Sequence, residues 1–134
     1  MKFMVMVKAT ADSEAGRVPS REEYEAVALF NEKLAKDGIL LSGGGLRPSS
    51  KGTRLRFARG RKTVTDGPFA ETKELVAGWA IVQGKSRSEI VALFENAPFV
   101  DCDVEIREVM EAEDFGEAAT PEMGERNRRA LGRT

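Results

Sequence analysis

Lys2-Phe3-Met4-Val5-Met6-Val7-Lys8 is the stretch of sequence from which the fold can be worked out. The odd-numbered positions, beginning with Phe3, are apolar and point to one side of a strand, while Met4 and Met6 point to the other. A strand with two apolar sides is typical of a sheet that is covered on both faces. Leu75 to Gln83 has the same character, so the sequence predicts two such strands.

A first helix is predicted after the first strand. Ser20 and Glu23 match a capping box, in which Ser20 is the N-cap and the Glu23 side chain reaches back to the Ser20 amide. The helix should run to about Asp37, because Gly38 is a suitable C-terminal stop. Apolar residues at helical spacing predict its core stripe, which consists of Tyr24, Val27, Phe30 and Leu34.

A second helix is predicted near the end of the domain. Ser86 and Glu89 form another capping-box candidate, and Pro98 limits the helix to about Asn96. The side chains expected to be buried are Ile90, Leu93 and Phe94.

Shorter strands are predicted between and after these elements. Ile39 to Ser42 predicts a strand that leads into three glycines, and Val104 to Met110 predicts the last strand. Thr53 to Arg59 and Arg61 to Asp66 predict a hairpin around Gly60. In that hairpin the alternation places two apolar side chains inward and two basic ones outward: Leu55 and Phe57, against Arg54 and Arg56.

The order of these elements is β-α-β-hairpin-β-α-β. It predicts an α+β protein with a ferredoxin-like antiparallel sheet and two helices on one face. We expect one domain over residues 1–116 and a polar C-terminal tail over residues 117–134. Because the helix-free face would be a large apolar patch on a monomer, we expect two copies to pack face to face as a homodimer.

Composition excludes several kinds of chemistry. The 134 residues contain no histidine, which excludes Ser-His-Asp and Cys-His catalysis and histidine-ligated haem or zinc. Acid–base chemistry must then use carboxylates, lysine, tyrosine or water. We expect no metal and no cofactor.

Charge and cysteine content indicate the surroundings. A net charge of −1 gives no overall basic excess, so direct binding to nucleic acid or to a membrane is not expected. The single cysteine, Cys102, fits a reducing compartment and lies between two aspartates that disfavour its thiolate. No stretch approaches about 20 apolar residues, so we expect a cytoplasmic protein.

One motif carries a family resemblance. Asp66-Gly67-Pro68-Phe69-Ala70-Glu71-Thr72-Lys73-Glu74 resembles the signature of the DGPF (YCII-related) family. The opening strand, Ser42-Gly43-Gly44-Gly45-Leu46 and Glu105-Ile106-Arg107 are also similar to that family, and the resemblance covers roughly residues 1–116. It implies the dimeric α/β-barrel superfamily and a frequent gene neighbourhood with extracytoplasmic-function sigma factors. The His-Asp pair of YCII proteins does not transfer, because this chain lacks histidine.

The motif also supplies candidate catalytic residues. Asp66 or Glu71 could act as a base, and Lys73 could stabilise developing negative charge. In an extended segment, Glu71 and Lys73 would share one side. The same residues also allow a structural interpretation, in which Asp66 caps a turn, Phe69 anchors the loop and Lys73 forms a surface ion pair.

Ligand-binding residues are predicted around these. Consecutive glycine amides followed by Arg47 could hold an anion, although a bulge or close backbone approach is the interpretation of the glycines that we favour. The predicted set is Ser42, Gly44, Arg47, Phe69, Thr72 and Glu74.

Two further features have structural interpretations. Seven basic residues between Arg47 and Lys62 are interrupted by no acid, and we expect a solvated face or pairing with the acidic stretch 101–117, within or across subunits. Trp79 is expected in the core or at the dimer interface.

Two functions are compatible with these features. The first is a small-molecule-binding protein, or a cofactor-free enzyme, with a cleft near the Asp66–Glu74 loop. The alternative is a regulatory interaction protein linked to a sigma factor.

Overall fold

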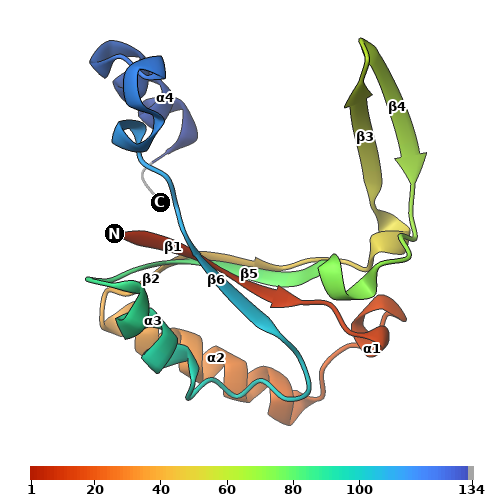
Figure 1. Ribbon diagram of the computed structural model, residues 1–134. Coiled ribbons are helices and arrows are strands. Elements are labelled where there is room, and N and C mark those ends of the chain that lie inside the picture. The colour runs from red at the N-terminus through yellow and green to blue at the C-terminus, as the bar shows by residue number, and fades with distance from the viewer. Residues whose placement is uncertain (133–134) are drawn as a thin grey trace.

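A computed structural model describes residues 1–132. Four strands form one antiparallel sheet in the order β2-β5-β1-β6, with β1 at Lys2–Lys8, β2 at Leu40–Gly45, β5 at Val76–Gln83 and β6 at Val104–Glu108. Helices α2 (Arg21–Lys36) and α3 (Arg87–Phe94) lie on one face of this sheet (Figure 1). The predicted α+β, ferredoxin-like sheet with two helices on one face is therefore confirmed.

The core lies between the sheet and the two helices. Phe3 and Val5 of β1, Val82 of β5 and Ile90 of α3 are at most 1% exposed. Phe3 pairs with Val82 across the strands, which joins the two apolar strands at the centre of the sheet. The Phe30 and Phe94 rings meet edge to face at 5.4 Å and connect α2 to α3.

Both predicted N-caps form, but neither closes as a reciprocal box. The Ser20 hydroxyl accepts a hydrogen bond from the Glu23 amide at 3.2 Å. The Glu23 carboxylate instead accepts from the Arg17 guanidinium at 2.7 Å, a charge-assisted bond that is stronger than one from a neutral amide. Likewise Ser86 accepts from the Glu89 amide, while the Glu89 carboxylate accepts from the Lys85 amide.

Tyr24 corrects the predicted core stripe of α2. Leu34 is buried and Phe30 half-buried, but Tyr24 is 69% exposed. At 3.6 residues per turn, Tyr24 lies about 80° around the helix from Leu34, at the edge of the stripe. Its ring lines a shallow apolar groove with Val18 and Pro19 instead.

The hairpin stands apart from the main sheet. Strands β3 (Thr53–Ala58) and β4 (Arg61–Asp66) form a separate two-stranded sheet that rises from the helix-free face (Figure 1). Arg59 and Gly60 form its turn with φ of 51° and 73°. Leu55 and Phe57 are 60% and 71% exposed, so the prediction that they face inward is wrong within one chain. Every residue of both strands is exposed, because no other layer of the described chain packs on the hairpin.

The C-terminal segment also leaves the sheet, at the opposite end (Figure 1). Strand β6 ends at Glu108, and a 3-10 helix η3 (Ala112–Ala118) and helix α4 (Pro121–Leu131) follow. The segment predicted only as a polar tail thus contains a helix. Thr120 caps it by accepting from the Met123 amide, and Pro121 occupies its first turn. None of the described helices combines the length and apolar character of a membrane span.

Candidate ligand-binding site

The Asp66–Glu74 loop fixes the base of the hairpin. Asp66 accepts a hydrogen bond from the Thr53 hydroxyl at 3.0 Å, across the first pair of the β3–β4 ladder. The Arg54 guanidinium lies 3.8 Å from the centre of the Phe69 ring, which is a cation–π contact. The loop therefore holds the hairpin from both of its faces.

Ser49 holds the other side of this loop. It lies in the 3-10 helix η1 (Ser49–Lys51), and its hydroxyl accepts a hydrogen bond from the Phe69 amide at 3.1 Å. A Cβ on Gly67 would lie 1.8 Å from the Ser49 carbonyl oxygen, so only glycine fits at that position. Phe69 is half-buried and anchors the loop through Ser49 and Arg54, whereas the Asp66 side chain bonds Thr53 across the ladder rather than capping a turn.

Glu14 joins the same cluster and was not predicted from the sequence. It ends the short helix α1 (Ala11–Glu14), and its carboxylate accepts from the Ser49 amide at 2.8 Å and from the Ser49 hydroxyl. The bond from the Ser49 hydroxyl has the larger effect and the bond from the Ser49 amide the smaller one, and both lower the pKa of Glu14 below its ordinary value. No periodicity or motif in the loop before α2 distinguishes this glutamate from its neighbours, so sequence reasoning had no signal for it.

The remaining charged residues of the loop face solvent. Glu71 and Lys73 are exposed, and the segment Thr72–Glu74 forms the 3-10 helix η2 rather than an extended strand. The Glu74 amide donates a hydrogen bond to the Glu71 carbonyl at 2.9 Å and closes a tight turn, so the prediction that Glu71 and Lys73 share one side of an extended segment is wrong. Among the described residues, no hydrogen bond or ion pair joins Asp66, Glu71 and Lys73.

Ser42 and Gly44 lie on the sheet, away from these loop residues. Ser42 pairs with Ile81, and Gly44 pairs with Trp79. A Cβ on Gly44 would come within 3.3 Å of the Trp79 indole nitrogen, so the glycine leaves room for the ring. Arg47 is exposed beyond the end of β2.

The helix-free face of the sheet carries an apolar floor. Met4 pairs with Ile81, and Met6 pairs with Trp79. These four side chains alternate with the core residues of the same strands, so they point away from the helices. All four are half-buried.

A polar row borders this floor on β6. Glu105 pairs with Met6 and Arg107 pairs with Met4, so both point to the helix-free face. Lys8 follows Met6 at the end of β1, and its side chain is only 17% exposed. Its ammonium group donates to the Glu74 carbonyl at 3.3 Å and lies 3.9 Å from the Glu105 carboxylate. Lys8 thereby connects the apolar floor with the loop that contains the predicted site residues.

Lys8, Glu105 and Arg107 were not among the predicted site residues. The alternation of β1 contains a signal for Lys8, since it places Lys8 on the same side as Met4 and Met6. The two residues of β6 could be placed only once the register with β1 was known.

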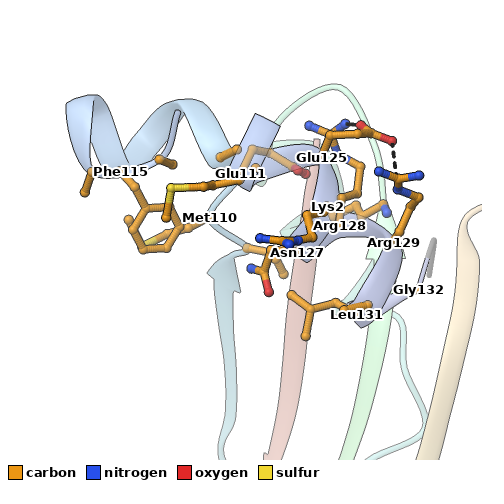
Figure 2. A pocket seen from close by; sticks show the side chains of 18 residues that line it. Lys2, Met110, Glu111, Phe115, Glu125, Asn127, Arg128, Arg129, Leu131 and Gly132 are labelled. Carbon is orange, nitrogen blue, oxygen red and sulfur yellow. Dashed lines mark hydrogen bonds and ion pairs between the residues drawn. The ribbon is translucent and has the colours of Figure 1, made fainter. Parts of the chain in front are cut away.

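A hollow lies at the other end of β1. Its volume is about 930 Å³, and the residues that line it come from η3, α4 and the start of β1, including Lys2 (Figure 2). Figure 2 shows Met110 beside Phe115, with Glu125 paired to Arg128 and Arg129. None of the predicted site residues lines this hollow, which lies about 20 Å along β1 from Lys8 at 3.3 Å per residue.

The single thiol and the grouping of possible metal ligands complete the description of the site. Burial, followed by the charges of Asp103 and Asp101, raises the pKa of the half-buried Cys102 thiol, which keeps it protonated. Within residues 1–132, no three His, Cys, Asp or Glu side chains are grouped so that they could hold a metal ion.

Comparison with known proteins gives the chain a family. No curated protein sequence matches it. Among solved structures, it is similar to 5-chloro-2-hydroxyhydroquinone dehydrochlorinase from Burkholderia phenoliruptrix, in complex with 2,5-dihydroxybenzoquinone. That similarity has 18% identity, covers 85% of this chain and 98% of the other, and has a TM-score of 0.49. The family profile of the YCII-related domain matches residues 1–113. The chain therefore belongs to the YCII-related domain family.

Proposed function

We propose that this protein binds a small amphipathic anion on the helix-free face of its sheet. The observation that carries the proposal is Lys8, a largely covered cation at the edge of an apolar floor. Its contacts at 3.3 and 3.9 Å are at the long end of hydrogen-bonding and ion-pair distances. Apolar surfaces with a few convergent polar groups are typical of small-molecule sites.

The apolar part of the ligand would lie on Trp79, Met4 and Met6. The indole gives a flat face for an aromatic or planar group, and the two thioether side chains adapt their shape to the ligand. The anionic part would replace the Glu74 carbonyl as a partner of Lys8. The loop residues Glu71, Thr72 and Lys73 lie next to this end and are proposed to contact its polar substituents.

A second copy of the chain completes the proposed site. The floor is open to solvent in one chain, and a ligand there would be covered only from below. Two sheets packed face to face would enclose the ligand and remove a continuous apolar surface from water. The proposal therefore includes a homodimer with two equivalent sites.

If a reaction occurs at this site, proton transfer is the reaction that its residues support. Glu105 provides a carboxylate 3.9 Å from the Lys8 ammonium group. The carboxylate could remove a proton next to a carbonyl, while Lys8 stabilises the resulting oxyanion. Such a reaction needs neither histidine nor a cofactor.

Fluorescence of the single tryptophan tests the site directly. The probe is 1-anilinonaphthalene-8-sulfonate, an aromatic anion that accepts energy from indole. We expect energy transfer from Trp79 and, for Lys8→Met, about tenfold weaker binding, because a charge-assisted hydrogen bond is lost. Lys85→Met, which removes an exposed lysine after β5, is the matched control. Unchanged binding to Lys8→Met would refute the proposed role of Lys8.

A second experiment separates this function from the regulatory alternative. A tagged chain purified from its native host would be examined for bound small molecules and for bound proteins. Recovery of a small molecule that is lost on the Lys8→Met substitution supports the ligand site. Recovery of a sigma factor, with no small molecule, would favour the interaction protein instead.

A further inference from the structure

We propose that the β3–β4 hairpin is a dimerisation arm that lies against the C-terminal arm of a second copy. The C-terminal arm is defined here as η3 and α4, residues 112–131. Both arms rise from the helix-free face, at opposite ends of the sheet (Figure 1). A second copy on that face must therefore pass between them and contact both.

The hairpin has one apolar and one basic face. In the ladder, Leu55 pairs with Val64, and Phe57 lies on the same side as both. Leu55 is 60% exposed, Val64 65% and Phe57 71%. Arg54 and Arg56 alternate with them and occupy the other side. The apolar face is a continuous stripe that nothing in the described chain covers.

The C-terminal arm offers a matching surface. Its hollow is about 930 Å³ in volume and is lined by Met110, Phe115, Met123 and Leu131, each of which is more than half exposed (Figure 2). The hollow thus has the size and the apolar lining to receive large side chains such as Phe57.

Opposite charge accompanies the apolar match. The hairpin, residues 53–66, contains five basic residues and one acidic residue, Asp66, which gives a net charge of +4. The C-terminal arm, residues 112–131, contains five acidic residues and three arginines, which gives a net charge of −2. Complementary potentials of this kind guide association and fix the register of two partners.

Charge also selects between two symmetric arrangements. A two-fold axis between facing sheets can run along the line that joins the two arms or perpendicular to it. Along the line, each basic hairpin would meet the partner's basic hairpin, and each acidic arm the partner's acidic arm. Perpendicular to the line, each hairpin lies beside the partner's C-terminal arm, which is the arrangement that we propose.

The Asp66–Glu74 loop gives the hairpin a fixed direction. The Thr53 hydroxyl donates a hydrogen bond to Asp66, and the Arg54 guanidinium lies over the Phe69 ring. Gly67 lies so close to the Ser49 carbonyl that no side chain would fit there. A hairpin held at its base can present its stripe to a partner without first becoming ordered. In this proposal, the family motif positions the dimerisation arm.

Charge reversal in the full-length chain tests the contact. The hairpin variant is Arg59→Glu/Lys62→Glu, because Lys62 pairs with Phe57 on the side of the stripe and Arg59 lies in the turn. The C-terminal variant is Glu113→Lys/Glu117→Lys; all four side chains are exposed, so the fold should be retained. Each variant alone should raise the dimer dissociation constant about tenfold or more, measured by sedimentation equilibrium. All four substitutions in one chain should restore the wild-type constant. The control Lys85→Glu/Arg87→Glu makes the same charge change at the start of α3, outside the proposed contact.

Two results would overturn the proposal. One is a hairpin variant that dimerises as wild type does. That result would mean that the hairpin does not contact the partner's C-terminal arm. The other is a four-residue variant whose dimer is weaker than that of either parent, because reversal of both partners should compensate. Phe57→Ser tests the apolar stripe separately and should also weaken the dimer, since this side chain contributes to no core within one chain.

The inference rests on the second copy that completes the proposed ligand site, and the two can fail separately. A wild-type monomer at all concentrations would refute both. A wild-type dimer that binds 1-anilinonaphthalene-8-sulfonate through Lys8 but shows no charge compensation would refute the arm contact alone. A dimer with compensation but with no dependence of probe binding on Lys8 would refute the ligand site alone.

Discussion

At the scale of single residues, Ser49 has the most connections around the family motif. Its hydroxyl and its amide donate hydrogen bonds to the Glu14 carboxylate, and the hydroxyl also accepts one from the Phe69 amide. Its carbonyl oxygen occupies the space that a side chain on Gly67 would need. The sequence allowed a structural interpretation in which Phe69 anchors the loop and Asp66 caps a turn; Phe69 makes such contacts, while Asp66 bonds Thr53 across the ladder instead. It gave no indication of Glu14, because the partner of Glu14 lies 35 residues away and no local pattern joins them.

Gly67 is expected to tolerate no side chain. In Gly67→Ala, the new Cβ would lie 1.8 Å from the Ser49 carbonyl oxygen, so the loop or η1 must move. We expect a loss of about 3 kcal/mol in the free energy of unfolding, measured by urea denaturation. Gly45→Ala is the matched control: its Cβ meets no other residue closer than 4.0 Å, and it should change stability by less than about 0.5 kcal/mol. Equal effects of the two substitutions would contradict the role of Gly67.

Glu14 should make stability depend on pH in the acid range. Its pKa is lower in the folded chain than its ordinary value of 4.5, so its ionised form contributes stability above that value, and the contribution is lost as the pH falls through the folded pKa. Glu14→Gln should therefore melt lower than wild type at pH 7, and the difference should shrink below about pH 4. Thermal unfolding followed from pH 7 to pH 3 measures this. A constant difference over the whole range would contradict it.

At the scale of elements, local signals predicted the helices better than the position of the hairpin. Ser20 and Ser86 cap their helices as expected, since a cap depends on residues three apart. The hairpin forms with its predicted strands, but whether its apolar side faces inward depends on a layer that one chain does not supply. The helix α4 could have been predicted from Thr120-Pro121, a cap followed by an N-terminal proline.

Helix α4 should be separable from the core. The buried cluster comprises Phe3, Val5, Val82 and Ile90, and none of these residues or of the side chains packed on them belongs to α4. A chain that ends at Ala119 should therefore keep slow hydrogen exchange at the amides of β1 and β5. It should lose dimer affinity, because the proposed C-terminal arm is shortened. Fast exchange throughout β1 would show instead that α4 supports the fold.

The cap of α2 provides a further test at this scale. Ser20→Ala removes the hydroxyl that accepts from the Glu23 amide and should cost about 1 kcal/mol of unfolding free energy. Ser20→Thr, which keeps a hydroxyl, should recover most of this loss. Both free energies are measured by urea denaturation. A Ser20→Ala variant with unchanged unfolding free energy would mean that the Arg17–Glu23 pair alone stabilises the start of the helix.

At the scale of the whole molecule, two apolar strands determine the architecture. Their two-sided pattern predicted a sheet covered on both faces, and the order of the elements predicted two helices on one of them. The observed strand order β2-β5-β1-β6 agrees with that antiparallel, ferredoxin-like sheet. The proposed site could not be predicted as a unit, because Lys8, Trp79 and Glu105 meet only through the pairing of three strands. Their face is also the one that we propose a second copy covers.

Native mass spectrometry, with 1-anilinonaphthalene-8-sulfonate added in increasing amounts, tests whether the ligand site forms only in the dimer. We expect a species of twice the 14.7 kDa chain mass that takes up to two probe molecules, with no uptake by the dissociated chain. A monomer at micromolar concentration that takes up the probe as readily as any dimer would contradict it, because the site would then need no second copy.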